Sequence, residues 1–257
     1  MKKDLSIIVP TYNEKENIKV LIPRIHKTLN KYNIDYEVII VDDDSPDGTA
    51  KIAEALSRKY PVKIIKRENE KGLYSAIVEG AKHATSNIVV VMDADLQHPP
   101  ELIPKMYFWI KKGYDLVIAS RYISGATIDR WNPIRRLISW GARSIAYILV
   151  PRLRNIKDIE SGFFITHRSS ISKLNPNENS WKILIDLILS NSSTKYILEI
   201  PYKFGRRVHG ESKFTPRVIK DYIWHIIRLG CKRGKLVSLS PAIWRMYLIY
   251  KKLKRVT

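Results

Sequence analysis

Two acidic side chains separated by one residue give this chain its clearest chemical signal. Asp93 and Asp95 follow the unbroken apolar run 88–92, and the amide of Gln97 comes two residues later. A short β-branched run that ends in carboxylates is typical of a buried parallel strand. Carboxylate and amide oxygens are hard ligands that suit Mg²⁺ or Mn²⁺. The pattern therefore predicts a divalent cation site at a strand end, where open α/β sheets bind their ligands.

The rest of the chain is strongly basic, so this acidic patch needs an explanation. The 257 residues include 45 Lys and Arg against 25 Asp and Glu, which gives a formal net charge of +20. A field of this sign attracts phosphorylated molecules, anionic lipid or nucleic acid. The single cysteine, Cys231, excludes an internal disulfide framework. A metal ion that carries a diphosphate would account for acids in so basic a chain.

Short apolar runs alternate with helical patterns along most of the chain. The predicted strands are 6–10, 37–41, 62–65, 88–92, 115–119 and 196–200, and the predicted helices are 16–31, 49–59, 72–84, 102–112 and 182–190. This alternation predicts an α/β fold with a mostly parallel, Rossmann-like sheet flanked by helices. Segment 158–166 is predicted to be a loop that returns to the sheet. The chain has neither a GxGxxG after its first strand nor a GxxxxGK[ST] sequence, so it must bind a nucleotide by other means.

Two segments in the second part of the chain are predicted to be amphipathic helices. Residues 131–150 and 216–233 each combine an apolar stripe with basic residues on another face. In the first segment, Arg135, Ser139 and Arg143 are spaced four residues apart and therefore share one helix face. For each segment alone, ordinary packing against a core is the alternative.

A basic tail follows the second of these helices. Segment 236–250 is apolar but is interrupted by serine, proline and arginine, whereas a membrane span takes about 20 mostly apolar residues. Basic clusters at 232–235 and 251–255 bracket it, and its aromatic residues suit a membrane interface. Packing on its own domain or on a partner subunit is the alternative. We therefore predict a domain over residues 1–235 and a membrane-associated tail over 236–257.

Five motifs occur in order along the chain. They are Pro10-Thr11-Tyr12-Asn13-Glu14, Asp42-Asp43-Asp44-Ser45, Asp93-Ala94-Asp95-Leu96-Gln97, Ser120-Arg121-Tyr122 and Arg207-Val208-His209-Gly210-Glu211-Ser212-Lys213. Over roughly residues 4–235 the chain resembles family 2 glycosyltransferases of the GT-A fold, and among them the dolichol-phosphate (polyprenyl-phosphate) mannose synthases. The acidic pair alone is a weak signal, but five motifs at these spacings are a specific one. The resemblance implies inverting transfer of mannose from GDP-mannose to a polyprenyl phosphate.

The resemblance also implies a donor site and a metal site on the acidic motifs. The residues that would hold the nucleoside are Pro10, Tyr12, Glu14 and Asp42. The residues that would hold the donor sugar and a Mg²⁺ or Mn²⁺ ion are Asp93, Ala94, Asp95 and Gln97, with Asp95 and Gln97 as metal ligands. From the residues alone, segment 42–47 also fits a turn and a helix cap. His98 is interpreted as a loop residue and not as a ligand.

Basic residues would hold the phosphates of the donor. Arg121 matches a family arginine that lies near the donor and acceptor phosphates, and with Asp93 and Asp95 it is assigned to catalysis. Arg207 and Lys213 match a loop that closes over the donor. An arginine binds a phosphate through two parallel hydrogen bonds, and a lysine supplies a point charge.

The acceptor side of the site is implied to lie at a membrane. Arg135 and Ser139 match the positions that bind the lipid phosphate in the family. Helices 131–150 and 216–233 match two helices that lie on the bilayer. The expected partners are dolichyl or another polyprenyl phosphate, an anionic membrane surface and possible small membrane-protein subunits, without nucleic acid. We expect peripheral or monotopic association with the cytoplasmic face of a membrane.

Two alternatives remain open from the sequence. A family 2 enzyme with UDP-glucose or another nucleotide sugar would carry the same motifs, and a hydroxyl acceptor would need a catalytic base, for which Asp158 and Glu160 are the candidates. A phosphate acceptor needs no strong base, because its second pKa of about 6 leaves it largely ionised near pH 7. A non-catalytic basic scaffold or nucleic-acid-binding protein is the other alternative, and the intact metal and diphosphate motifs argue against it.

Overall fold

The chain forms two compact units in a computed structural model. The structure describes residues 2–68, 71–129, 133–175, 182–190, 195–207 and 224–229. The first unit comprises Met1–Arg130, Lys157–Glu178 and Lys182–Ser212, and the second comprises Trp131–Ile156, Asn179–Trp181 and Lys213–Thr257. All of the acidic motifs therefore belong to the first unit. The predicted boundary after residue 235 lies outside the described residues.

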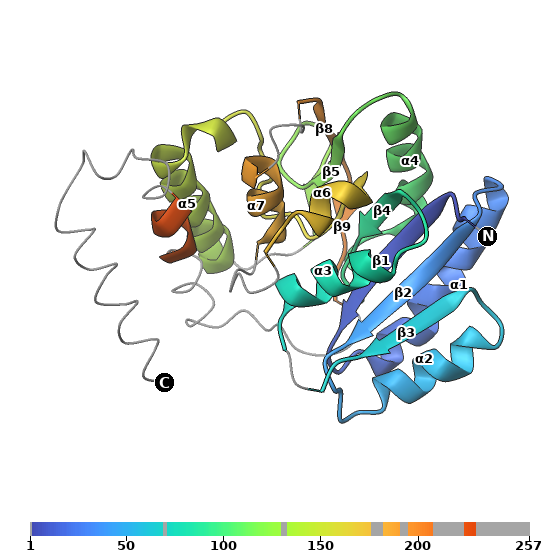
Figure 1. Ribbon diagram of the computed structural model, residues 1–257. Helices are drawn as coiled ribbons and strands as arrows, with labels where there is room; N and C mark the ends of the chain where they lie inside the picture. Colours follow the sequence, from blue (N-terminus) through green and yellow to red (C-terminus); the bar gives the residue numbers. More distant parts are fainter. Residues whose placement is uncertain are drawn as a thin grey trace. The chain divides into compact units, whose positions relative to one another are not determined.

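A seven-stranded sheet in the order β3-β2-β1-β4-β7-β5-β8 forms the centre of the first unit (Figure 1). Its strands are β1 (Leu5–Thr11), β2 (Tyr36–Asp42), β3 (Val62–Lys66), β4 (Ile88–Val91), β5 (Leu116–Ser120), β7 (Phe164–His167) and β8 (Ile197–Pro201). Only β7 runs antiparallel to its two neighbours. A separate parallel pair joins β6 (Thr127–Ile128) to β9 (Lys203–Phe204). The predicted α/β fold with a mostly parallel sheet is confirmed.

The described part of the first unit also contains several helices. They are α1 (Lys15–Lys31), α2 (Thr49–Ser57), α3 (Leu73–His83), the short η1 (Pro100–Leu102), α4 (Ile103–Lys111), α6 (Arg168–Ser172) and α7 (Ile183–Ser190). Helix α1 contacts α2 and α4, whereas α3 contacts α6. Figure 1 shows α3 and α6 on the near side of the sheet.

The core lies between these helices and the central strands. Strands β1, β2 and β5 are buried along nearly their whole length, which explains why each reads as a continuous apolar run. Helix α1 buries a stripe at helical spacing, namely Ile18, Leu21, Ile22, Ile25 and Leu29. In these elements the residues that are apolar in the sequence are the ones that are buried in the structure. The observed strands therefore lie close to the predicted positions.

The sheet register brings the motif-bearing loops to one edge. Thr11 pairs with Asp42 at the ends of β1 and β2, and Ser120 pairs with Pro201 at the ends of β5 and β8. Because β7 runs the opposite way, the loop that precedes Phe164 reaches the same edge. The carboxyl ends of parallel strands thus meet the segment that was predicted to be a loop.

That prediction of a loop over 158–166 is wrong at its end. Residues 158–163 are irregular, but β7 (Phe164–His167) inserts between β4 and β5. Its partners lie far away in the sequence, and four residues carry too little periodicity to reveal a strand. The short elements α6, β6 and β9 were also not predicted, for the same reason.

The second unit contains a long helix near its start. Helix α5 (Pro133–Leu149) is followed by a turn of 3₁₀ helix, η2 (Pro151–Leu153), and residues 224–229 are helical. Tyr147 Oη donates to the Ile156 carbonyl at 2.7 Å, which closes the end of α5 onto the following turn. The remainder of the predicted helix 216–233 and the tail lie outside the described residues. Within the described part, no helix is long and apolar enough to cross a membrane.

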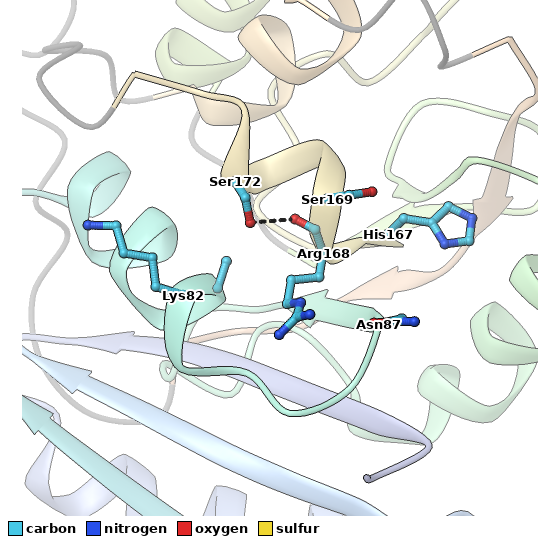
Figure 2. A pocket seen from close by; sticks show the side chains of 7 residues that line it. Lys82, Asn87, His167, Arg168, Ser169 and Ser172 are labelled. Carbon is cyan, nitrogen blue, oxygen red and sulfur yellow. Dashed lines mark hydrogen bonds between the residues drawn. The ribbon is translucent and has the colours of Figure 1, made fainter.

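A pocket of about 440 Å³ lies at the opposite edge of the sheet from the acidic motifs (Figure 2). Its lining residues include Lys82 at the end of α3, Asn87 before β4, His167 at the end of β7 and Arg168 at the start of α6. Arg168 Nη1 donates to the Ala84 carbonyl at 2.7 Å, and this bond ties α6 to the loop after α3. None of the residues assigned to the site from the sequence lines this pocket.

Close packing of α3 on the sheet gives a test of the fold. A Cβ at Gly80 would lie 2.6 Å from Ile8 Cγ2 and 3.1 Å from Val41 Cγ2. We expect Gly80→Ala to lower the free energy of unfolding by about 1–3 kcal/mol, because the helix must move off the sheet. Urea denaturation measures this change. At Gly141, within α5, a Cβ meets no atom within 4 Å, so Gly141→Ala should be neutral or stabilising. Equal midpoints for the two variants would contradict the packing.

Candidate active site

The loop after β4 holds the acidic pair in two different environments. The Asp93 side chain is 42% exposed, whereas Asp95 is only 4% exposed. Leu96 adopts a left-handed backbone conformation with φ of 65°, which turns the chain back on itself. The Gln97 backbone N–H then donates to Asp95 Oδ1 at 3.1 Å, and the Gln97 side-chain amide donates to the Gly205 carbonyl at 2.9 Å. The loop is therefore held by its own acid and by the segment after β9.

Asp95 carries an unfavourable negative charge in this loop. Burial raises the pKa of Asp95 above its ordinary value, and the neighbouring Asp93 raises it further. His98 and Arg207 act in the opposite direction. Arg207 Nη2 donates to Asp95 Oδ2 at 2.8 Å, and its Nη1 lies 3.9 Å from Glu14 Oε1. A guanidinium thus supplies part of the positive charge that this carboxylate requires.

The same oxygens suit a divalent cation. The described residues contain no group of three or more His, Cys, Asp and Glu side chains that could enclose a metal ion. Mg²⁺ seldom needs such a cage, because it is usually held by one or two protein ligands together with substrate phosphates and water. The Asp95 carboxylate and the Gln97 amide oxygen fit that pattern, since the Gln97 amide nitrogen is already engaged by Gly205.

His98 is a loop residue, as predicted, but its ring is buried. Its Nδ1 accepts a hydrogen bond from the Asp93 backbone N–H at 3.1 Å, which leaves the proton of the neutral ring on Nε2. The ring stacks on Phe163 with 5.2 Å between centroids. Burial lowers the pKa of His98 to about 4, so its 3.8 Å approach to Asp93 Oδ2 is not an ion pair at neutral pH. His98 therefore anchors the acidic loop to an aromatic cluster.

Arg121 ends β5 at this edge and is held by a buried carboxylate. Its Nε and Nη2 donate to the two oxygens of Asp158 at 2.8 and 2.7 Å, and its backbone N–H donates to Asp158 Oδ2 at 2.9 Å. Burial alone would lower the pKa of Arg121 and raise that of Asp158, but the pairing outweighs burial. The pKa of Asp158 therefore lies below its ordinary value and that of Arg121 above it. The rings of Tyr122 and Phe204 each lie 5.3 Å from the Arg121 guanidinium carbon.

Lys182 belongs to the same cluster, although no sequence motif pointed to it. Its Nζ donates to the Glu160 carbonyl at 3.0 Å, just before α7 begins. The pKa of Lys182 lies below its ordinary value, because burial lowers it more than the negative charges of Glu160, Asp93 and Asp158 raise it. An isolated lysine ahead of an apolar helix gives no local signal, because its partners come from distant loops.

The loop after β2 is organised by its own side chains. Asp42 is buried, and its carboxylate accepts hydrogen bonds from Thr11 Oγ1 at 2.9 Å and from Ser45 Oγ at 2.6 Å. Asp47 accepts from the N–H of Thr49, the first residue of α2, at 2.9 Å, whereas the N-cap residue itself is Gly48. Turn formation is thus visible for segment 42–47, and a nucleoside contact for Asp42 stays a prediction.

The other predicted nucleoside residues line the first loop. Glu14 is buried and accepts from Asn17 Nδ2 at 2.6 Å. The Tyr12 ring is partly exposed, with Lys71 Nζ 5.9 Å from its centroid. Pro10 lies at the end of β1 beside these two residues. This exposed ring and the adjacent buried acid are compatible with binding a base and a ribose.

A buried ion pair that the sequence did not reveal closes the neighbouring loop. Arg67 donates through Nε to Asp43 Oδ1 at 2.8 Å and also contacts this oxygen through Nη2. The Gly72 N–H donates to Asp43 Oδ2 at 2.7 Å, and the Gly72 carbonyl accepts from Arg67 Nη2 at 2.9 Å. The start of α3 is therefore tied to the end of β2. In the sequence, Asp43 is only the middle acid of the run 42–44. Its partner Arg67 lies 24 residues away, so no local pattern indicates the pair.

Ala94 lies at this edge, buried between the two acids of the loop after β4. The remaining predicted residues, Lys213, Arg135 and Ser139, are not part of the described first unit. Lys213 and the side chain of Arg135 lie outside the described part. Ser139 is buried within α5, in the second unit, and its carbonyl accepts from Arg143 Nε at 3.4 Å. The acceptor role of Arg135 and Ser139 therefore stays a prediction.

The Arg121–Asp158 pair gives a stability test. Asp158→Asn leaves a buried guanidinium without its carboxylate, so we expect the free energy of unfolding to fall by about 3–5 kcal/mol at pH 7. Because the folded pKa of Asp158 is depressed, the stabilisation is present above the unfolded pKa and is lost as pH falls through the folded pKa. The difference between wild type and variant should accordingly shrink in acid, as followed by urea denaturation.

An exposed pair provides the control for this test. Arg206 Nε lies 3.2 Å from Asp129 Oδ2, and both side chains are exposed. Asp129→Asn should change the free energy of unfolding by at most about 0.5 kcal/mol. Equal effects of the two substitutions would show that the buried pair does not stabilise the fold.

Comparison with known proteins identifies the family. The sequence profile of "Glycosyl transferase family 2" matches residues 6–174. A dolichol-phosphate mannosyltransferase of Pyrococcus furiosus is 46% identical over 232 residues, which cover 90% of this chain and 65% of that protein. The chain thus spans just under two thirds of that relative. A dolichol-phosphate mannosyltransferase of Saccharomyces cerevisiae is 37% identical over 266 residues, which cover 98% of both chains.

Solved structures show the same fold. Glucosyl-3-phosphoglycerate synthase of Mycobacterium tuberculosis, in complex with Mn²⁺, UDP-glucose and phosphoglyceric acid, superposes with a TM-score of 0.70. The match covers 89% of this chain and 80% of that one at 18% sequence identity. The profile match and the relatives at 37% and 46% identity are decisive for the family. The chain belongs to glycosyltransferase family 2.

Proposed function

We propose that this chain transfers mannose from GDP-mannose to dolichyl or another polyprenyl phosphate, with inversion at the anomeric carbon. The observation that carries the proposal is the buried carboxylate of Asp95, which requires a cation, in the acidic loop of a family 2 chain. Relatives named dolichol-phosphate mannosyltransferases at 37% and 46% identity support the sugar and the lipid acceptor.

A divalent cation, Mg²⁺ or Mn²⁺, would be held by Asp95 and Gln97. Such an ion neutralises the charge of the departing diphosphate. In the structure Arg207 donates a hydrogen bond to Asp95 Oδ2. Once a cation is bound to Asp95, Arg207 would leave this carboxylate and bind the diphosphate instead. Asp93, which is partly exposed to solvent beside this site, would face the donor sugar.

The state of Asp158 favours a phosphate acceptor over a hydroxyl acceptor. A hydroxyl would need a carboxylate base, but both Asp158 oxygens accept hydrogen bonds from Arg121, and the pKa of Asp158 is depressed. A proton acceptor of this kind is weak. A phosphate monoester is already an anion and needs positioning and charge neutralisation instead. Arg121 supplies a permanent positive charge at the same edge.

Helix α5 suits contact with a lipid surface. Trp140 is 63% exposed and Ile148 is 68% exposed, whereas Ala146 on the same helix is fully buried. A basic chain with exposed apolar side chains favours an anionic bilayer by about 1 kcal/mol for each charge near the surface. We therefore propose peripheral or monotopic association with the cytoplasmic face of a membrane, with small membrane-protein subunits as possible partners.

The decisive experiment is transfer of labelled mannose from GDP-mannose to polyprenyl phosphate in detergent, with and without Mn²⁺. The proposal expects a labelled lipid product that requires the metal ion. UDP-glucose is the competing donor. Transfer of glucose in place of mannose would support the alternative family 2 activity, and absence of any transfer with intact nucleic-acid binding would support a scaffold role.

Asp95→Asn tests the metal site in the same assay. We expect transfer to fall by roughly 100-fold or more, because a group that stabilises charge is lost from a buried site. The melting temperature without ligand should be unchanged or higher, because the fold disfavours the ionised form of Asp95.

Metal affinity of the wild type should weaken as pH falls through this raised pKa, at a higher pH than for an ordinary carboxyl group. Asp35→Asn, at an exposed acid paired with Lys3, is the control. Normal Mn²⁺ dependence in Asp95→Asn would refute the ligand assignment.

Arg135→Ala tests the acceptor assignment. Loss of a charge-assisted hydrogen bond to the lipid phosphate should raise the KM for polyprenyl phosphate by about 10-fold or more. The KM for GDP-mannose should stay unchanged. Arg152→Ala, at an exposed arginine of η2, controls for the general loss of a positive charge from the second unit. An increase of the same size in both variants would favour a diffuse electrostatic effect.

A further inference from the structure

Tyr202 lies between β8 and β9, next to the acidic loop, and no sequence motif includes it. The residue is 5% exposed. Its ring packs edge-on against Phe163, Phe204 and His98, with centroid distances of 6.0, 6.1 and 6.2 Å. His98 is the residue that holds the backbone of Asp93. The ring is therefore fixed by the aromatic cluster that also positions the acidic loop.

The hydroxyl of Tyr202 is buried, and the described residues offer it no hydrogen-bond partner. The charges that act on it belong to the candidate active site, namely Arg121, Asp158, Asp93 and Asp95. Burial raises the pKa of Tyr202, so the phenol stays protonated and can donate. Buried polar groups in folded proteins are nearly always paired, and an exception calls for an explanation. In this position the explanation is an acceptor that enters with the ligand.

We infer that the Tyr202 hydroxyl donates a hydrogen bond to an oxygen of the bound donor, and so helps to hold the nucleotide sugar. The inference rests on the proposed function. Two oxygens have the required chemistry: a hydroxyl of the donor sugar, or an oxygen of the diphosphate with its hydrated metal ion. Asp93 and Asp95 act on this hydroxyl and also form the acidic pair of the proposed donor site. Tyr202 is thus assigned as a binding residue for the donor.

Tyr202→Phe tests this role because it removes one oxygen and preserves the ring packing. Without ligand, the melting temperature should be unchanged or higher, since an unpaired buried hydroxyl is removed. The Kd for GDP-mannose in the presence of Mn²⁺, measured by titration calorimetry, should rise about fivefold, the effect of one neutral hydrogen bond. The same titration with GDP and Mn²⁺ separates the two acceptors. A fivefold loss with both ligands identifies the diphosphate side, and a loss with GDP-mannose alone identifies the sugar.

Tyr36→Phe is the matched control. Tyr36 is also buried, but its hydroxyl has a partner, because its Oη lies 2.8 Å from His26 Nδ1. Tyr36 begins β2 and therefore lies at the opposite edge of the sheet from the candidate active site. This variant should lower the melting temperature and leave the Kd for GDP-mannose unchanged. The inference fails if Tyr202→Phe behaves like Tyr36→Phe, or if it binds both ligands as tightly as the wild type. If the wild type binds GDP and Mn²⁺ but not GDP-mannose, the proposed donor fails instead.

Discussion

Burial of a negative charge at the end of β4 is the constraint on which the site depends. Asp95 is nearly inaccessible to water and has a second acid two residues before it, and both effects raise the pKa of Asp95. A carboxylate in this state is stable only next to positive charge. The ligand-free chain supplies that charge through Arg207, which is itself partly exposed. The exposure of Arg207 makes the pairing exchangeable, which is what the proposed binding and release of a metal diphosphate would require.

Three acid–arginine pairs at the same sheet edge differ in how firmly they are held. Asp43–Arg67 and Asp158–Arg121 are buried on both sides and joined by more than one hydrogen bond. Arg207–Asp95 is joined by one hydrogen bond. The first two pairs are therefore firmly held in place, because breaking a buried pair is strongly unfavourable. The third has the weaker connection expected of a pair that ligands displace.

The sequence predicted those parts of the site that depend on local pattern. Asp93, Asp95 and Arg121 follow apolar runs directly, and the carboxyl ends of parallel strands must share an edge, so their assembly in one place could be anticipated. His98 and Lys182 could not, because their surroundings come from loops that are distant in sequence. Strand β7 was not predicted for a similar reason, since the sequence of its four residues does not indicate that it pairs with β4 and β5.

The insertion of β7 also explains how one edge comes to hold both kinds of charge. An antiparallel strand within a parallel sheet brings the residues before it to the edge where its neighbours end. Asp158 thereby meets Arg121, and Phe163 meets His98 behind the acidic loop. If β7 were parallel, that loop would lie at the opposite edge, Arg121 would be buried without a carboxylate, and the ring that supports Asp93 would lose its stacking partner. The topology of this one strand is therefore a condition for the charge pattern of the site.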